Sequence, residues 1–257
     1  GESAFSVEEN ESTEKTGEET FKYNKSIRYG LSAIKSIGKP VIDAIVRERN
    51  QNGIYRNFRN FVERLSGKEL NKRTIENFIK AGALDGLCDN RKQLMMIYVQ
   101  VVDSVNQEKK NAMAGQMSLF DFVAEEDKKD FEIRMPDVEE YDKEQLLAFE
   151  KEVLGVYISG HPLEKYEKMW QKNISATTMD FAYQEELHGS RLFDGAEEII
   201  GGMVEGITIK HTKNNKTMVF LTIEDLLGTV EVVVFPRQYE IYRNSIIQDG
   251  KLFIQGH

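Results

Sequence analysis

The sequence predicts a multidomain α+β protein in which an all-α part of the chain precedes a short β part. Apolar residues recur at the i, i+3 and i+4 spacing of helices between residues 27 and 110, and alternate as in strands after residue 198. The acidic stretch that follows the helical part has little periodicity, which is typical of a connector. With 257 residues, 40% of them hydrophobic, the chain is long enough for two compact domains or several small modules.

Composition excludes several classes of protein. No run approaches the roughly 18 apolar residues that a bilayer-spanning helix needs, and the Glu-rich start of the chain is unlike a secretory signal. The single cysteine, Cys88, excludes an internal disulfide framework and disfavours a thiolate zinc site. We therefore expect a cytoplasmic protein with no membrane partner.

The charge is unevenly distributed along the chain, although the total is -9. Residues 27–110 hold 16 Lys and Arg against 9 Asp and Glu, a net +7, whereas residues 111–152 hold 5 against 13, a net -8. A basic module beside an acidic connector is a pattern that suits a nucleic-acid partner better than the total suggests.

Residues 1–26 form an acidic lead-in. The stretch Glu8–Glu19 is rich in Glu, Ser and Thr, which predicts a mobile segment. The short runs Ala4–Val7 and Thr20–Tyr23 are expected to pair as a marginal hairpin at most. We expect the chain to be a fragment of a longer protein.

Residues 27–110 contain two units that look like helix–hairpin–helix motifs. In the first, Leu31 and Ile34 begin one helical face and Val41–Val46 continues a second. Between them, Gly38 is expected to take a backbone angle that other residues avoid, and Pro40 to open the second helix. In the second unit, helices over Lys72–Lys80 and Arg91–Gln107 flank a Gly-containing hairpin at residues 81–86.

Such hairpins present free amides and a helix N-terminus to a DNA phosphate, and a pair of them can grip a duplex without reading its bases. The candidate DNA-binding residues lie in or beside the two hairpins: Lys35, Ser36, Ile37, Gly38, Lys39, Arg73, Lys80, Gly82, Arg91 and Lys92. The alternative is an ordinary helical bundle whose basic residues form a solvated face. The repetition and the charge of the segment favour DNA.

The acidic connector, residues 111–144, contains an apolar patch at Gly115–Phe122, with the sequence GQMSLFDF. An exposed apolar cluster in such a segment suggests a peptide that docks in a partner's pocket. From these residues alone, the favoured alternative is that Leu119, Phe120 and Phe122 fold back onto the preceding helices. A helical bridge is expected over residues 145–197, where His161 has no catalytic partner at a recognisable spacing and is interpreted as a turn residue.

Residues 198–257 are predicted to begin a small β-barrel. Strands are expected over Ile199–Lys210, Thr217–Glu224, Thr229–Phe235 and Leu252–Gln255, with a helix over Pro236–Ser245. This order is that of an oligonucleotide/oligosaccharide-binding (OB) fold that lacks its fifth strand. Its candidate single-strand-binding residues are Lys210, Lys213, Lys216 and Phe220. We expect the aromatic residues Phe220, Phe235 and Tyr239 to be core, because a small barrel needs them.

With these parts assembled, the chain resembles the DnaE-type bacterial DNA polymerase III alpha subunits, in the region after the polymerase fingers. The resemblance covers nearly the whole chain and rests on five motifs in the same order. They are IRYGLSAIKSIG, NKRTIENFIKAGALD, QMSLFDF, FEKEVLGVYISGHPL and FLTIEDLLGTVEVVVFP. The chain departs from the family at Ser36, where the usual hairpin has Gly, and in its incomplete barrel.

The resemblance implies a tandem helix–hairpin–helix module that grips duplex DNA during DNA replication, a sliding-clamp peptide and an OB domain associated with single-stranded DNA. The implied clamp-binding residues are Gln116, Met117, Ser118, Leu119 and Phe120. Catalytic carboxylates, and the Mg²⁺ of the parent DNA-directed DNA polymerase, a nucleotidyltransferase, are implied to lie upstream. We therefore expect no catalytic residue, metal or cofactor here, and other replicase subunits as further partners. The rival hypotheses are a helix–hairpin–helix repair nuclease or glycosylase, and a protein-interaction scaffold.

Overall fold

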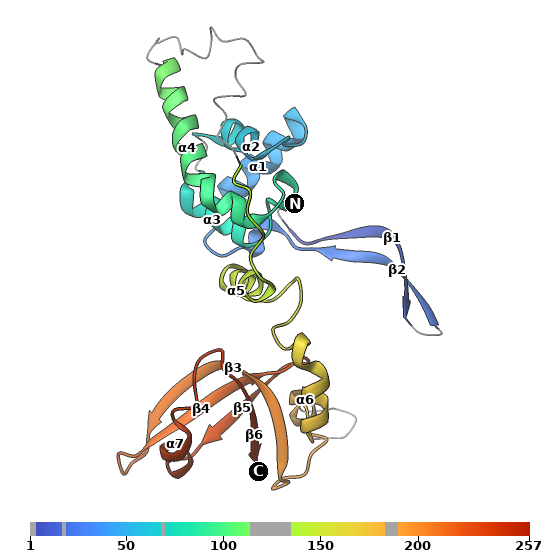
Figure 1. Cartoon of the computed structure of the whole chain (residues 1–257), viewed down its shortest axis with the longest axis vertical. Coiled ribbons are helices and arrows are strands. Elements are labelled where there is room, and N and C mark those ends of the chain that lie inside the picture. Colours follow the sequence, from blue (N-terminus) through green and yellow to red (C-terminus); the bar gives the residue numbers. More distant parts are fainter. Residues whose placement is uncertain (1–3, 17–18, 68–69, 114–134, 183–189) are drawn as a thin grey trace. The chain divides into compact units, whose positions relative to one another are not determined.

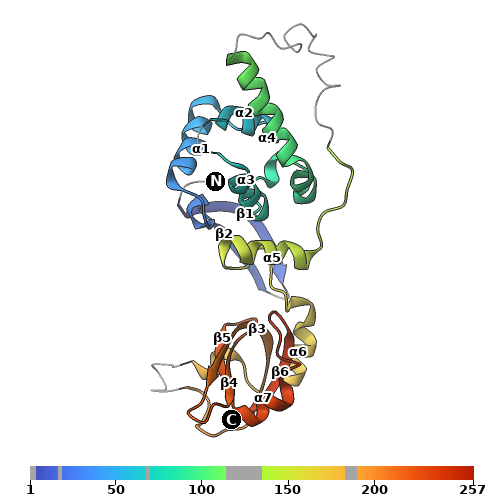
Figure 2. The same cartoon turned by 90° about the vertical axis from the view of Figure 1, so that its left-hand side faces the viewer.

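The computed structural model describes residues 4–16, 19–67, 70–113, 135–182 and 190–257. The chain divides into two compact units, Gly1–Ser159 and Gly160–His257 (Figures 1 and 2). The first is a helical module and the second contains a curled antiparallel sheet, so the predicted fold class is confirmed: an all-α module followed by a partial OB fold. The division between the units falls inside the predicted helical bridge, residues 145–197.

The first unit is built from helices around one hydrophobic core. Its α-helices are α1 Lys39–Asn52, α2 Phe58–Leu65, α3 Lys72–Lys80, α4 Arg91–Met113 and α5 Lys143–Leu154, and its 3-10 turns are η1 Leu31–Ala33 and η2 Asp85–Leu87. The apolar faces of α1 to α4 meet at Ile42, Leu65, Phe78 and Leu94, each no more than 2% exposed. Their helical spacing in the sequence is the pattern that places them on one face.

Local sequence signals set the helix ends in this unit. The side chains of Asn57, Asn71 and Asp142 accept hydrogen bonds from the third residue of α2, α3 and α5, respectively. These amides have no partner inside the helix, so an Asn or Asp just before the helix stabilises it. Helix α5 ends at Gly155, whose φ of 80° lies in the left-handed region that favours glycine.

The N-terminal segment forms a longer hairpin than its sequence suggested. Strand β1, Ser6–Thr16, pairs antiparallel with β2, Glu19–Arg28, and the register runs from Ser6 opposite Arg28 to Thr16 opposite Glu19. The described residues of the stretch Glu8–Glu19 therefore belong to paired strands, whereas the sequence predicted a mobile segment without regular structure. The two strands are joined by hydrogen bonds between their backbones, and this pairing does not require apolar side chains. The sequence therefore holds little apolar pattern from which the full hairpin could be predicted.

The first helix of the first hairpin unit is also different from the prediction. Ile27 belongs to strand β2, and Leu31 begins only the three-residue 3-10 turn η1. Leu31 and Ile34 are nevertheless buried in the core, 8% and 4% exposed. Their spacing correctly identified two inward-facing residues, but one short turn is enough to place both of them.

The second unit is a four-stranded antiparallel sheet with short helices. Its elements are η5 Glu164–Tyr166, α6 Glu167–Asn173, η6 Thr178–Phe181, β3 Glu198–His211, β4 Thr217–Glu224, β5 Thr229–Val234, α7 Pro236–Tyr242 and β6 Lys251–Gly256. The strand order is β5-β4-β3-β6. The predicted order of three strands, a helix and a fourth strand is therefore observed. The register shift between Val204 and Gly206 marks a bulge in β3, and the sheet is curled (Figure 1).

Two buried contacts fix the short helices to the sheet. The indole Nε1 of Trp170 in α6 donates to the carbonyl of Gly201 at 2.6 Å, where a Cβ on Gly201 would lie 2.8 Å from the Trp170 ring and 2.6 Å from Phe253. The buried carboxylate of Asp225 accepts from both the amide and the hydroxyl of Thr178. Glycine at residue 201 is therefore required for α6 to approach β3 closely.

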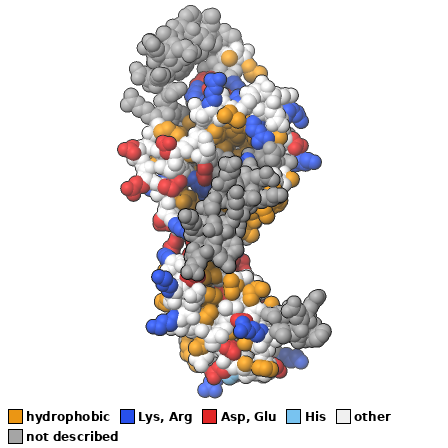
Figure 3. Space-filling view, turned by 90° about the vertical axis from the view of Figure 1, so that its right-hand side faces the viewer, with side chains coloured by type: hydrophobic (Ala, Val, Ile, Leu, Met, Phe, Trp, Pro, Cys, Tyr) orange, Lys and Arg blue, Asp and Glu red, His pale blue; other side chains and the backbone are white. Residues whose placement is uncertain are grey.

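The three aromatic residues expected in the barrel core are placed differently from one another. Tyr239 packs against the core of the sheet, but Phe235 is 60% exposed and Phe220 is half-buried on the opposite face. The expectation of a core position is wrong for Phe220 and Phe235. Strand β4 buries Val219, Leu221 and Ile223, so the alternation of side chains along the strand turns Phe220 outward. Figure 3 shows hydrophobic side chains at the surface of this unit among Lys and Arg.

Candidate nucleic-acid interface

The start of α1 is an open helix N-terminus. Gly38 is its N-cap residue and makes no side-chain cap, and Pro40 lies in the first turn and has no amide hydrogen. Within the part of the chain that the structure describes, the amides of Gly38 and Lys39 donate to no acceptor. The first amides of a helix and its dipole favour an anion at this end.

The backbone that leads into α1 is not arranged as predicted. Gly38 was expected to hold the unusual angle, but its φ is -73°, which any residue can adopt. The left-handed residue is Ser36, with a φ of 63°. This is the position where the usual hairpin pattern has glycine, and a left-handed conformation strains a serine there.

Three exposed cations surround this open end: Lys35 and Lys39 from the first hairpin and Arg73 from α3. None of the three has an acidic partner among the described residues. By contrast, Lys72, next to Arg73, pairs with Asp103 at 2.8 Å. Unpaired cations beside free amides are the groups that a DNA phosphate would contact.

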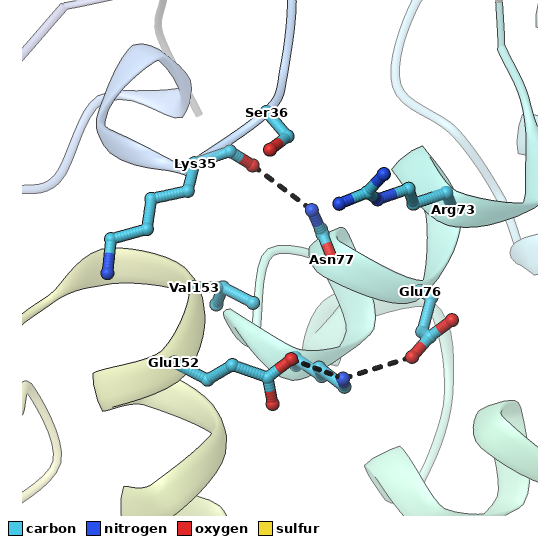
Figure 4. Close-up of a pocket in the computed structure, with 8 residues that line it drawn as sticks. Lys35, Ser36, Arg73, Glu76, Asn77, Glu152 and Val153 are labelled. Atoms are coloured by element: carbon cyan, nitrogen blue, oxygen red, sulfur yellow. Dashed lines mark hydrogen bonds and ion pairs between the residues drawn. The ribbon is translucent and has the colours of Figure 1, made fainter.

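An open pocket of about 560 Å³ lies between the first hairpin, α3 and α5. Its lining is polar and comprises Lys35, Ser36, Arg73, Glu76, Asn77, Lys80, Glu152 and Val153 (Figure 4). The amide of Asn77 donates to the carbonyl of Lys35 at 3.0 Å, which ties α3 to the first hairpin. Figure 4 shows Arg73 extending from α3 toward Asn77, on the side where Ser36 lies.

In the second hairpin, the cation Arg91 is bound by other groups of the protein. Gly82 has a φ of 71°, and a Cβ there would lie 2.2 Å from a guanidinium nitrogen of Arg91. Arg91 donates to Asp85 at 2.9 and 3.0 Å, and to the carbonyl of Lys80 at 3.3 Å. Its guanidinium also lies 3.6 Å from the buried Glu150. Burial opposes the charge, but Asp85 and Glu150 outweigh it and raise the pKa of Arg91.

Lys80 and Lys92 are also engaged within the first unit. Lys80 pairs with Glu76 at 3.0 Å and with Glu152 at 2.8 Å. Burial opposes its charge, yet these two carboxylates raise the pKa of Lys80. The ammonium of Lys92 lies over the ring of Tyr141, 5.7 Å from its centroid.

The start of α4 is closed, unlike that of α1. The carboxylate of Glu140 accepts from the amides of Arg91 and Lys92, and Asn90 caps the amide of Gln93. Neither the role of Asn90 nor that of Glu140 was predicted from the sequence. Asn90 could have been found as an Asn directly before a helix, but no local signal could have found Glu140, which is about 50 residues further along the chain.

The structure thus separates the predicted DNA-binding residues into two groups. Lys35, Ser36, Ile37, Gly38, Lys39 and Arg73 lie at or beside the open first hairpin. Lys80, Gly82, Arg91 and Lys92 lie at the second hairpin, where the three charged side chains are held by groups of the protein. The predicted clamp-binding residues, Gln116, Met117, Ser118, Leu119 and Phe120, lie outside the described residues.

The candidate single-strand-binding residues gather at one end of the curled sheet. Lys210, Lys213 and Lys216 are exposed around the turn from β3 to β4. The ammonium of Lys210 lies 4.2 Å from the centroid of the Phe220 ring. Phe220 pairs across the ladder with Val233, which is 37% exposed, so an apolar row bordered by a cation lies on the outer face.

The described residues show no pattern of a metal site or of a membrane-spanning helix. Among the residues that the structure describes, no group of three or more His, Cys, Asp or Glu side chains could hold a metal ion. No described helix is both long and apolar enough to cross a membrane. The Nδ1 of His161 accepts from the Leu163 amide at 3.1 Å, a contact within its own turn.

The helical part of the chain is similar to a known family of proteins. Residues 3–94 match the family described as the helix-hairpin-helix motif. The chain therefore contains a helix–hairpin–helix module in the part where the sequence predicted two such units.

The particular relatives are DNA polymerase III alpha subunits. The chain is 34% identical over 235 residues to that of Borreliella burgdorferi, covering 91% of this chain and 20% of the relative. It is 34% identical to that of Mycobacterium tuberculosis over 234 residues, 90% of this chain and 19% of the relative. It is 31% identical to that of Deinococcus radiodurans over 228 residues, which cover 88% of this chain and 17% of the relative. The chain matches a region of the DNA polymerase III alpha subunit, as its motifs predicted, and spans about a fifth of these relatives.

Proposed function

We propose that this chain is a DNA-binding region of a replicative polymerase and that its first hairpin binds the backbone of duplex DNA. The observation that supports this most is the open start of α1, surrounded by Lys35, Lys39 and Arg73 without acidic partners among the described residues. A phosphate there would accept hydrogen bonds from backbone amides and from charged side chains, and it would interact favourably with the helix dipole. Such contacts hold a duplex without reading its sequence.

Two neighbouring cations of α3 allow a controlled test. Arg73→Gln removes an unpaired cation, whereas Lys72→Gln removes one that is already paired with Asp103. Both variants lose the same formal charge. We expect Arg73→Gln to weaken duplex binding about tenfold, as the loss of ~1.4 kcal/mol would, and Lys72→Gln to weaken it less than about twofold. Fluorescence anisotropy with a labelled duplex measures both affinities, and equal losses would contradict the proposed site.

We further propose that residues 116–120 tether the polymerase to its sliding clamp. The support is the motif QMSLF in the acidic connector after the hairpin module, and the resemblance to alpha subunits, in which such a peptide docks on the clamp. A docked peptide raises the local concentration of the polymerase at the primer end. The double substitution Leu119→Ala and Phe120→Ala should abolish capture of a purified sliding clamp, whereas Val123→Ala should not. Full capture by the double variant would refute the tether.

The curled sheet is proposed to bind single-stranded DNA on its outer face. The support is the contact between the exposed Lys210 and the half-buried ring of Phe220, beside Lys213 and Lys216. Stacking of a base on an aromatic ring contributes about 1–3 kcal/mol. Phe220→Leu keeps an apolar group but removes the ring, and we expect it to weaken binding of an oligothymidylate at least about fivefold. Phe193→Leu, at an 87% exposed position outside the strands, is the control and should bind as the wild type does.

Catalysis is proposed to lie outside this chain. The support is the resemblance, which implies polymerase carboxylates in a palm domain upstream, and the finding that the chain spans about a fifth of its relatives. The parent protein would bring other replicase subunits as partners. Incubation of the chain with a labelled primer–template, Mg²⁺ and deoxynucleotides should give neither extension nor cleavage. Cleavage would support the nuclease alternative.

A further inference from the structure

The start of α4 is occupied by a carboxylate of the chain itself. Glu140 Oε2 accepts from the Arg91 amide at 2.7 Å, and Oε1 accepts from the Lys92 amide at 3.1 Å. Asn90 Oδ1 accepts from the Gln93 amide at 2.8 Å. The first three amides of this 23-residue helix therefore have acceptors. A carboxylate at a helix N-terminus satisfies these donors and interacts favourably with the helix dipole.

The segment around Glu140 is held on α4 by further contacts. Asn90 Nδ2 donates to the carbonyl of Val138 at 2.9 Å. Tyr141 lies under the ammonium of Lys92, and its amide donates to Glu140 Oε1 at 2.8 Å, which orients the carboxylate. The same ring meets Phe149 of α5 edge-to-face at 5.1 Å. The chain that leads into α5 is thus attached to the second hairpin unit.

We propose that the carboxylate of Glu140 occupies the start of α4 and so excludes a DNA phosphate from it. The hairpin module then binds the DNA backbone through its first hairpin alone. This inference rests on the proposed function. A phosphate would have to displace a carboxylate held by two amides, and the negative charge of Glu140 repels it while in place. The open start of α1 has no such group. The two hairpins, similar in sequence pattern, therefore differ in what they can bind.

The neighbouring Glu139 provides a matched control. It is exposed and makes no hydrogen bond or ion pair with another described residue. Glu139→Gln and Glu140→Gln change the net charge equally, so any difference between them comes from the contact with α4. Glu140→Ala removes the group entirely. Circular dichroism melting checks that each variant is folded before binding is compared.

The first measurement is amide hydrogen exchange. We expect Glu140→Gln to speed exchange at Arg91 and Lys92 about tenfold and Glu139→Gln to leave it unchanged. Unchanged exchange at both amides in Glu140→Ala would overturn the closure itself.

The second measurement is duplex affinity. Opening α4 frees backbone amides for one phosphate and removes a repelling carboxylate, so Glu140→Ala should bind several-fold more tightly than Glu139→Gln. If the wild type binds duplex and the two variants match in affinity, the proposed closure fails and the function stands. If the wild type does not bind but Glu140→Ala does, the closure stands and the first-hairpin function fails. Binding by none of the three proteins would overturn both.

Discussion

Ser36 is the residue at which this chain departs most clearly from the hairpin pattern. Its φ of 63° matches the 71° of Gly82 in the second hairpin, but only glycine adopts this region without strain. A non-glycine residue there costs roughly 1–2 kcal/mol. Ser36 therefore leaves the first hairpin less stable than glycine would.

We predict that Ser36→Gly stabilises the first unit by up to about 1 kcal/mol, because relief of strain exceeds the entropy that glycine loses on folding. The matched control is Ser32→Gly, four residues earlier in η1, where φ is not positive. It should destabilise the unit by about 0.5 kcal/mol. Urea unfolding followed by far-ultraviolet circular dichroism gives both values. If Ser36→Gly loses as much stability as Ser32→Gly does, Ser36 is not strained.

Cys88 gives a prediction that depends on pH. Burial, and next the carboxylates of Asp85 and Glu140, raise the pKa of the Cys88 thiol to about 11. The thiolate is the reactive form, and an ordinary cysteine has a pKa near 8.5. At pH 8 we expect iodoacetamide to modify folded Cys88 on the order of 100-fold more slowly than the urea-unfolded chain. The rate should keep rising to about pH 11; a plateau near pH 9 would contradict this environment.

At the scale of elements, α5 is joined to the hairpin module through three separate contacts. The amide of Lys35 donates to the carbonyl of Val153 at 2.7 Å, and Glu152 pairs with Lys80. Glu150, only 2% exposed, faces Arg91 and accepts from the amides of Ile158 and Ser159 at 2.8 and 2.9 Å. Removal of this buried carboxylate would leave two amides without their acceptor and the Arg91 charge without one partner, which costs far more than the loss of an exposed ion pair.

We predict that Glu150→Ala destabilises the first unit by about 2–4 kcal/mol, because two partly buried amides lose their acceptor and Arg91 loses a buried partner. Glu152→Ala, two residues away on the exposed side, should cost less than about 1 kcal/mol. Denaturant unfolding followed by circular dichroism compares the two variants. Similar losses would mean that Glu150 is not the main attachment of α5.

Some elements were predictable and others were not, for identifiable reasons. Helix α3 has the predicted bounds, because Asn71 caps it and its apolar residues all face the core. Strand β4 also matches, because Val219, Leu221 and Ile223 alternate with outward residues. The length and register of the N-terminal hairpin and the short turn η1 were not predicted, because backbone pairing and a single turn leave almost no periodic signal.

At the scale of the whole molecule, the net charge of a module overstates how many cations are available. The hairpin region is net +7, yet Lys72, Lys80 and Arg91 are paired with carboxylates. Beside the first hairpin, the exposed cations Lys35, Lys39 and Arg73 have no acidic partner among the described residues, while Lys92 at the second hairpin lies over the ring of Tyr141.

This difference predicts the salt dependence of DNA binding. Each neutralised phosphate contributes about -0.9 to the slope of log K against log salt concentration. Three contacts give a slope of about -2.7, whereas contacts by all six predicted Lys and Arg residues would give about -5.4. Anisotropy titrations of the whole chain from 50 to 200 mM salt measure the slope. A value near -5 would show that both hairpins grip the duplex.

The sequence by itself determined the helix–hairpin–helix and OB-type architecture, the order of the strands and the family of its relatives. These depend on periodicity, on caps next to helices and on motifs, all of which are local in the chain. Only the tertiary structure decided which predicted contacts are free: it placed Glu140 on the start of α4 and Asp85 and Glu150 on Arg91. Pairing between residues up to about 60 positions apart depends on how helices pack, and no local pattern encodes it.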